Sequence, residues 1–321
     1  MSQHNLEEIP ETTVEDSSVN KRIRLIAWAI MIVAVIFLLG LGSGYWKWGR
    51  NETATVTQEQ QLTQLYQQIN PEAGYSLPVT YGNLGPQLVE AGVIDNDAFQ
   101  NVMTASGDPL SEQQLEILTK GSAEKIVITG ENAHFLLNFF WAVGLANRNS
   151  ILTEGTMVQN SDGQIERFAS TGGWSLATKP ITELYASLDL IPLTPEQQAR
   201  VVEVAAAVYR PCCNNPTLFP DCNHGMAMLG LLELMAAQGA STDEMFTAAK
   251  YVNAYWFPQQ TLEMAVYLKT NQDMDFADVD ARLVVSKELA SASGASMVHE
   301  SLQASGLLKP EPGQGGGSCA N

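Results

Sequence analysis

The chain has 321 residues, of which 35 are acidic and 17 are basic, so its formal net charge is -18. Hydrophobic residues make up 45% of the sequence, a composition that excludes disorder of the whole chain. Because binding to phosphate requires clustered Lys and Arg, the excess of acid argues against nucleic acid as a partner. The most reactive side chains are four cysteines and four histidines.

An apolar segment near the N-terminus predicts a transmembrane helix. Residues 25–46 contain no charged residue, and as a helix they would extend roughly 33 Å, enough to cross a bilayer. A polar segment precedes them and no small-residue cleavage site follows, so we interpret the segment as an uncleaved anchor. More basic residues precede the span than follow it. This bias predicts that residues 1–24 lie in the cytoplasm and that residues 47–321 are periplasmic or extracellular.

The remaining segments predict a mainly α-helical protein with one small β-hairpin. Residues 1–24 are rich in acid and poor in large apolar side chains, so we expect a disordered leader. Residues 47–193 are interpreted as a helical domain, with the β-hairpin near residues 156–168. Residues 194–308 form the second predicted helical domain, and residues 309–321 form a glycine-rich tail.

Several helix boundaries can be predicted from local chemistry. A Ser or Thr followed three residues later by Gln or Glu is typical of a capping box at a helix start. Three pairs of this kind directly precede predicted helices: Ser111 with Gln114, Thr194 with Gln197, and Ser241 with Glu244. The segment from Asn132 to Asn147 is apolar on nearly all sides but short for a second membrane span, so it predicts a central core helix.

Sulfur and imidazole side chains are concentrated in one loop. Cys212, Cys213, Cys222 and His224 lie within thirteen residues of one another, and Cys319 lies near the chain end on the glycine-rich tail. Such soft donors suit copper or zinc, so these five residues are the predicted metal ligands. The loop is expected to enter a helix near Cys222 and His224. The free N–H groups at that helix start would stabilise a thiolate.

Two alternatives to metal binding remain open for the cysteines. The first is a disulfide-stapled module without catalytic activity, because four cysteines in an oxidising compartment allow three pairings. The second is a thiol–disulfide redox protein. The spacing of the cysteines matches no standard zinc signature, and the sequence contains no other catalytic motif, so enzymatic activity is left open. Soft-metal binding or handling is the leading hypothesis.

Other residues near the loop are interpreted as structural. Met226 and Met228 are expected to pack into the core, and His134 is expected to be a buried histidine with satisfied hydrogen bonds. Asp221 is expected to cap a helix or to occupy a turn.

The segment from Tyr209 to Tyr255 resembles two groups of bacterial Cys-loop helical domains. It contains a helix end, the loop with Pro211-Cys212, and a helix that includes Gly225-Met226-Ala227. One group is the thiol-reducing domain of CcmH-type cytochrome c maturation proteins, which carries a CxxC pair where this chain has adjacent cysteines. The other is the secreted proteins named for a PCYCGC motif. The resemblance implies a membrane-tethered, extracytoplasmic domain that uses its cysteines for thiol or metal chemistry.

Overall fold

The structure is a computed structural model and describes residues 60–308. The predicted leader (residues 1–24), the predicted membrane span (residues 25–46) and the predicted tail with Cys319 lie outside the described residues. Between residues 60 and 308, no helix combines the length and the apolar character needed to cross a membrane.

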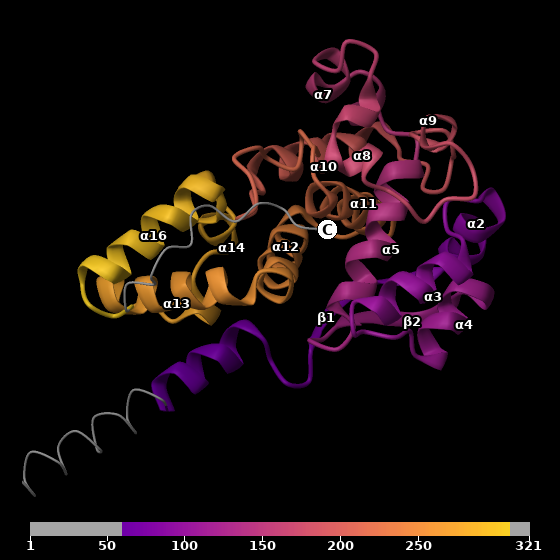
Figure 1. Cartoon of the computed structure of the whole chain (residues 1–321). Coiled ribbons are helices and arrows are strands. Elements are labelled where there is room, and N and C mark those ends of the chain that lie inside the picture. Colours follow the sequence, from indigo (N-terminus) through magenta and orange to yellow (C-terminus); the bar gives the residue numbers. More distant parts are fainter. Residues whose placement is uncertain (1–59, 309–321) are drawn as a thin grey trace, which may run out of the picture. The chain divides into compact units, whose positions relative to one another are not determined.

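The first part of the described chain combines helices with a small sheet (Figure 1). Residues 60–69 are helical. The next elements are β1 (Tyr75–Gly82), α2 (Leu84–Ala91), α3 (Asn96–Ala105), α4 (Glu112–Lys120), β2 (Ser122–Ile128) and α5 (Ala133–Ala146). Short helical turns follow: α6 (Ser150–Thr153), α7 (Thr156–Gln159), the 3-10 helix η1 (Ile165–Arg167), α8 (Ala169–Gly172) and α9 (Ile181–Leu184).

The second part is helical throughout its regular elements. The longer helices are α10 (Pro195–Ala207), α11 (Asn223–Ala237), α12 (Thr242–Trp256), α13 (Pro258–Gln272) and α16 (Ala292–Ala304). The short elements between α13 and α16 are η2 (Phe276–Asp278), α14 (Ala281–Val284) and α15 (Lys287–Ala290). The prediction of a mainly helical protein with one small region of β structure is therefore confirmed for the described residues.

The capping boxes predicted from sequence are present. Ser111, Thr194 and Ser241 each accept a hydrogen bond from the backbone N–H three residues on, and the side chain of that residue bonds back to the cap. Each of the three caps therefore starts a helix where the sequence predicts one, at α4, α10 and α12.

The location predicted for the β-hairpin is wrong. The turn itself exists, because Asp162 and Gly163 adopt left-handed backbone conformations at φ 52° and 78°. The residues before the turn close a helical turn instead of a strand, with the Asn160 N–H donating to the Thr156 carbonyl at 3.0 Å. Short alternation of apolar residues did not distinguish a strand from a one-turn helix here.

The β structure lies instead in β1 and β2, which pair antiparallel with Tyr75 opposite Ile128. The side-chain amide of Gln238 donates to and accepts from the backbone of Thr80 at 2.9 Å on the outer edge of β1. On β2, the amide of Asn132 donates to the Val127 carbonyl at 2.8 Å. These side-chain amides form hydrogen bonds with backbone groups that an exposed sheet edge would leave unpaired.

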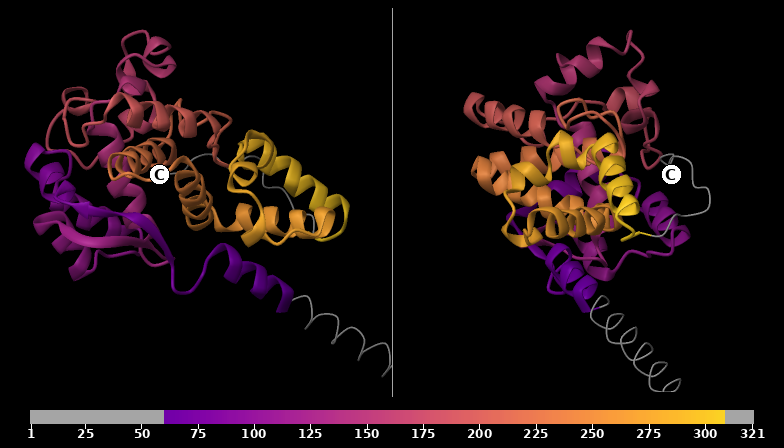
Figure 2. Two further views of the ribbon diagram at one scale, coloured as in Figure 1. Left: turned by 180° about the vertical axis from the view of Figure 1, so that it is seen from behind. Right: turned by 90° about the vertical axis from the view of Figure 1, so that its left-hand side faces the viewer.

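Helices α5 and α11 lie side by side and form the centre of the main apolar core (Figures 1 and 2). The predicted core helix is confirmed, because α5 is buried on nearly all sides. Glycines allow the close approach: a Cβ on Gly144 would lie 2.1 Å from the Met226 carbonyl oxygen, and one on Gly230 would lie 2.4 Å from that of Phe140. This core joins residues from both predicted domains, 47–193 and 194–308.

A second apolar cluster lies where α13 packs against α16. It contains Met264, Leu268, Val298 and Leu302, all buried. The cysteine loop, which connects α10 to α11, is held by elements of both clusters.

Candidate thiol and metal site

Backbone and side-chain hydrogen bonds fix the cysteine loop, residues 208–222, against the start of α16. The Ala292 N–H donates to the Cys213 carbonyl at 2.9 Å, and the Ser293 N–H donates to Asn214 Oδ1 at 2.9 Å. The first free N–H groups of α16 therefore point at the loop and bring the positive end of that helix toward it.

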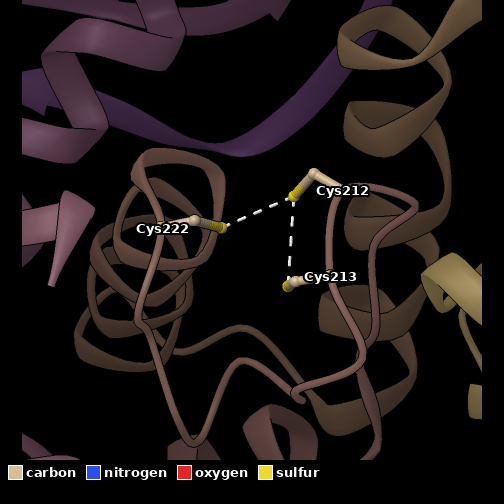
Figure 3. Close-up of side chains that lie close together, drawn as sticks. All are labelled: Cys212, Cys213 and Cys222. Carbon is tan, nitrogen blue, oxygen red and sulfur yellow. Dashed lines mark hydrogen bonds between the residues drawn. The ribbon is translucent and has the colours of Figure 1, made fainter. Parts of the chain in front are cut away.

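The loop gathers three thiols (Figure 3). The Sγ atom of Cys212 lies 3.5 Å from that of Cys222 and 4.0 Å from that of Cys213. All three Sγ atoms lie within 4.8 Å of one another, and all three cysteines are free thiols. These separations exceed a disulfide bond of about 2.05 Å. They match the spacing of about 3.8 Å between sulfurs that share a metal ion at a bond length of about 2.3 Å.

Cys222 is the N-cap of α11, so a helix starts near Cys222 and His224, where the sequence predicts one. Its Sγ accepts a hydrogen bond from the Gly225 N–H at 3.4 Å, and its side chain is buried. Cys212 and Cys213 are half-buried on the loop. The site therefore has one thiol fixed at a helix start and two thiols within reach of solvent.

Arg210 is the largest buried side chain beside the thiols and is only 1% exposed. Its Nε donates to Cys222 Sγ at 3.1 Å, and its Nη2 forms an ion pair with Asp221 Oδ1 at 2.9 Å. Its Nη1 donates to the Asn215 carbonyl at 2.9 Å. Gly225 makes room for it, because a Cβ there would lie 2.4 Å from Arg210 Nη2.

Arg210 is not among the site residues that the sequence predicts. The signal that could have found it is a basic residue directly before Pro211-Cys212, next to the predicted metal ligands of the loop. Its partner Asp221 lies eleven residues away, so no local pattern joins them. Asp221, expected to cap or turn, instead accepts from Arg210 and from Asn215 Nδ2 at 2.7 Å, while Cys222 takes the cap position.

The neighbours of the three thiols shift their pKa values in opposite directions. Hydrogen bonds from Cys212 and Cys213 lower the pKa of Cys222 well below its usual value, against the effect of burial, and Arg210 lowers it further. Hydrogen bonds to Cys213 and to Cys222, together with burial, raise the pKa of Cys212. For Cys213, its bond with Cys212 lowers the pKa, but contact with Cys222 and burial outweigh it and raise the value to about 11. Of the three thiols, Cys222 is therefore the one whose thiolate form its surroundings favour.

His224 does not join the three thiols. The metal-ligand group among the described residues contains only the cysteines, and His224 Nδ1 lies 2.8 Å from Asn223 Oδ1. The imidazole packs against Phe257, with ring centroids 4.4 Å apart. Burial lowers the pKa of His224 to about 4, so the ring is neutral at physiological pH. Side chains two residues apart at a helix start point in different directions, which separates His224 from Cys222.

Of the other expectations for residues near the loop, some are confirmed and one is wrong. Met226 and Met228 are buried in the core, as predicted. His134 is only half-buried, so the expectation of a buried histidine is wrong, but its Nδ1 has a hydrogen-bond partner as expected, Asp108 Oδ2 at 3.2 Å. Cys319, the fifth predicted ligand, lies outside the described residues.

The site therefore consists of three thiols that could hold one metal ion, next to a buried guanidinium and two helix starts. Comparisons with protein-family models, with curated proteins and with solved structures find no match to this chain.

Proposed function

We propose that the protein binds or handles a soft metal ion, copper or zinc, through Cys212, Cys213 and Cys222. The observation that carries this proposal is that three sulfur atoms lie within 4.8 Å of one another. Thiolates are the preferred ligands of Cu(I) and are common ligands of Zn(II).

The surroundings of the thiols support the binding of an anionic metal–thiolate complex. Gathering three negative charges in a buried site is costly unless positive groups offset them. Arg210 Nε and the Gly225 N–H donate to Cys222 Sγ, and the start of α16 brings its positive end to the backbone of Cys213. Cys212 and Cys213 are half-buried, which leaves a route for the ion from solvent to Cys222.

A second candidate function is thiol–disulfide exchange, favoured by the 3.5 Å separation of the Cys212 and Cys222 sulfurs. In this reaction the Cys222 thiolate attacks a partner disulfide, forms a mixed disulfide and releases one partner thiol. Cys212 sulfur then attacks Cys222 sulfur and releases the second partner thiol, so that one disulfide is reduced as another forms. Cys213 has no role in this scheme, whereas metal binding needs all three thiols.

The two candidates are separated by metal analysis of the full-length protein purified without a metal-affinity tag. We expect about one equivalent of copper or zinc in the wild type and at least a tenfold loss in each of Cys212→Ser, Cys213→Ser and Cys222→Ser. His224→Ala serves as the control for a nearby residue and should retain the metal. An unchanged metal content in Cys222→Ser would exclude the metal proposal. Loss of a thiol–disulfide activity in Cys212→Ser but not in Cys213→Ser would favour exchange.

We also propose that residues 25–46 anchor the protein in the cytoplasmic membrane and place the thiol site outside the cytoplasm. The support is the uncharged length of the segment and the basic residues before it. An alkaline phosphatase reporter fused after residue 308 should be active in bacterial cells, and a fluorescent protein that folds only in the cytoplasm should stay dark there. The opposite pair of signals would reject this orientation.

A further inference from the structure

The thiol site offers three sulfur donors and, among residues 60–308, no fourth donor in the same group. No His, Asp or Glu of this part of the chain has a ligand atom within 4.8 Å of all three sulfurs. Structural zinc sites in proteins are almost always four-coordinate and tetrahedral. Cu(I) is a soft ion that thiolates select, and three thiolates suffice to complete its coordination.

His224 and Asp221 could supply a fourth ligand, but other contacts hold both side chains in place. His224 Nδ1 lies against Asn223 Oδ1 at 2.8 Å, and the ring is packed on Phe257. Asp221 accepts from Arg210 through one carboxylate oxygen and from Asn215 through the other. Recruiting His224 through its Nε2 would move the ring away from Phe257, and recruiting Asp221 would leave the buried Arg210 without its carboxylate.

Positive groups around the sulfurs would offset the negative charge of the complex that Cu(I) would form. Three thiolates with one monovalent ion carry a charge of minus two, which has to be offset within a largely buried site. Arg210 donates directly to Cys222 Sγ. The start of α11 adds partial positive charge at Cys222 Sγ, and the start of α16 adds it at the Cys213 backbone carbonyl. Because Asp221 neutralises part of the Arg210 charge, the partial charges of the helix starts are also needed to offset the complex.

We infer that the site is a three-coordinate, all-sulfur site for Cu(I), formed by Cys212, Cys213 and Cys222. This inference rests on the proposed metal-binding function and narrows it to one ion and one coordination number. The His224 side chain is not a ligand in it, and Cys319, which lies outside the described residues, is examined by substitution.

X-ray absorption spectroscopy of the full-length protein loaded anaerobically with one equivalent of Cu(I) tests the inference. We expect three sulfur scatterers and no nitrogen or oxygen scatterer in the wild type. His224→Ala and Cys319→Ser should give the same spectrum, and Cys213→Ser should fall to two sulfurs. The same protein loaded with Zn(II) should show three sulfurs and an oxygen from water, and Cu(I) should displace that zinc.

The outcomes of this experiment distinguish a wrong coordination number from an absence of metal binding. A two-sulfur wild-type spectrum, a nitrogen scatterer that disappears in His224→Ala, or a lost sulfur in Cys319→Ser would overturn the three-coordinate site while leaving metal binding intact. Retention of zinc against Cu(I) would also overturn it. Failure of the wild type to hold either ion would reject the proposed function itself.

Discussion

Replacing Arg210 with Met is expected to destabilise the folded protein by about 3–5 kcal/mol, the usual effect of removing one partner of a buried ion pair. The substitution removes the donors to Cys222 Sγ, to the Asn215 carbonyl and to Asp221. Asp221 would then be held next to the thiolate of Cys222 with no cation between them. The same variant should lose most of its metal, because the negative charge of the bound complex is no longer offset.

Urea unfolding and metal analysis of the same samples measure both effects. Arg210→Lys keeps the charge but not the forked geometry, so it should retain more metal than Arg210→Met while still losing stability. Arg148→Met is the matched control, because Arg148 pairs with Asp189 on the surface with a side chain that is 57% exposed. Its cost should stay below about 1 kcal/mol. Equal stability and equal metal content in the Arg210 and Arg148 variants would contradict the role given to Arg210.

Glu233→Gln is expected to remove a strong pH dependence of stability. Glu233 is fully buried in α11, where Asn147 Nδ2 donates to its Oε2 at 3.0 Å. Burial raises its pKa from 4.5 to about 8, although hydrogen bonds from Asn147 and Asn149 oppose the shift. The folded protein therefore keeps this proton between about pH 4.5 and pH 8, while the unfolded chain loses it.

The direction of the effect follows from proton linkage. Because the folded state binds the extra proton, the free energy of unfolding falls as pH rises through this window, by about 1.4 kcal/mol per pH unit. The Gln variant cannot ionise, so its stability relative to the wild type should rise by about 3 kcal/mol or more from pH 5 to pH 8. Urea unfolding at pH 5, 6, 7 and 8 measures this difference. The exposed Glu203→Gln is the control, and a flat difference for Glu233→Gln would show that the buried carboxyl does not titrate as described.

Features of the fold that depend on local chemistry could be predicted from the sequence. The capping boxes at Ser111, Thr194 and Ser241 mark helix starts because each needs only four consecutive residues. The core helix α5 could be predicted because its apolar character extends around its whole circumference. The pairing of β1 with β2 could not, because their partners lie far apart in the sequence and the turn at Asp162–Gly163 offered a more local alternative.

The sulfur donors of the candidate site could be predicted from the sequence, but the residues packed around them could not. The density of sulfur in the loop predicted the grouping of Cys212, Cys213 and Cys222, which the structure brings together. Arg210 was missed because its importance comes from burial and from Asp221, neither of which a sequence pattern shows. His224 was included because it is close in sequence, but the direction of a side chain at a helix start depends on the local backbone and on packing against Phe257.

Alkylation of the metal-loaded protein, read by mass spectrometry of its peptides, tests most directly whether three thiols share one ion. Full-length protein would be treated with iodoacetamide under native conditions, with and without one equivalent of Cu(I). The structure predicts that one equivalent of the ion protects Cys212, Cys213 and Cys222 together, with all three deprotected when a chelator removes it. Unchanged alkylation of the three cysteines after loading, or protection of only one of them, would contradict a shared metal site.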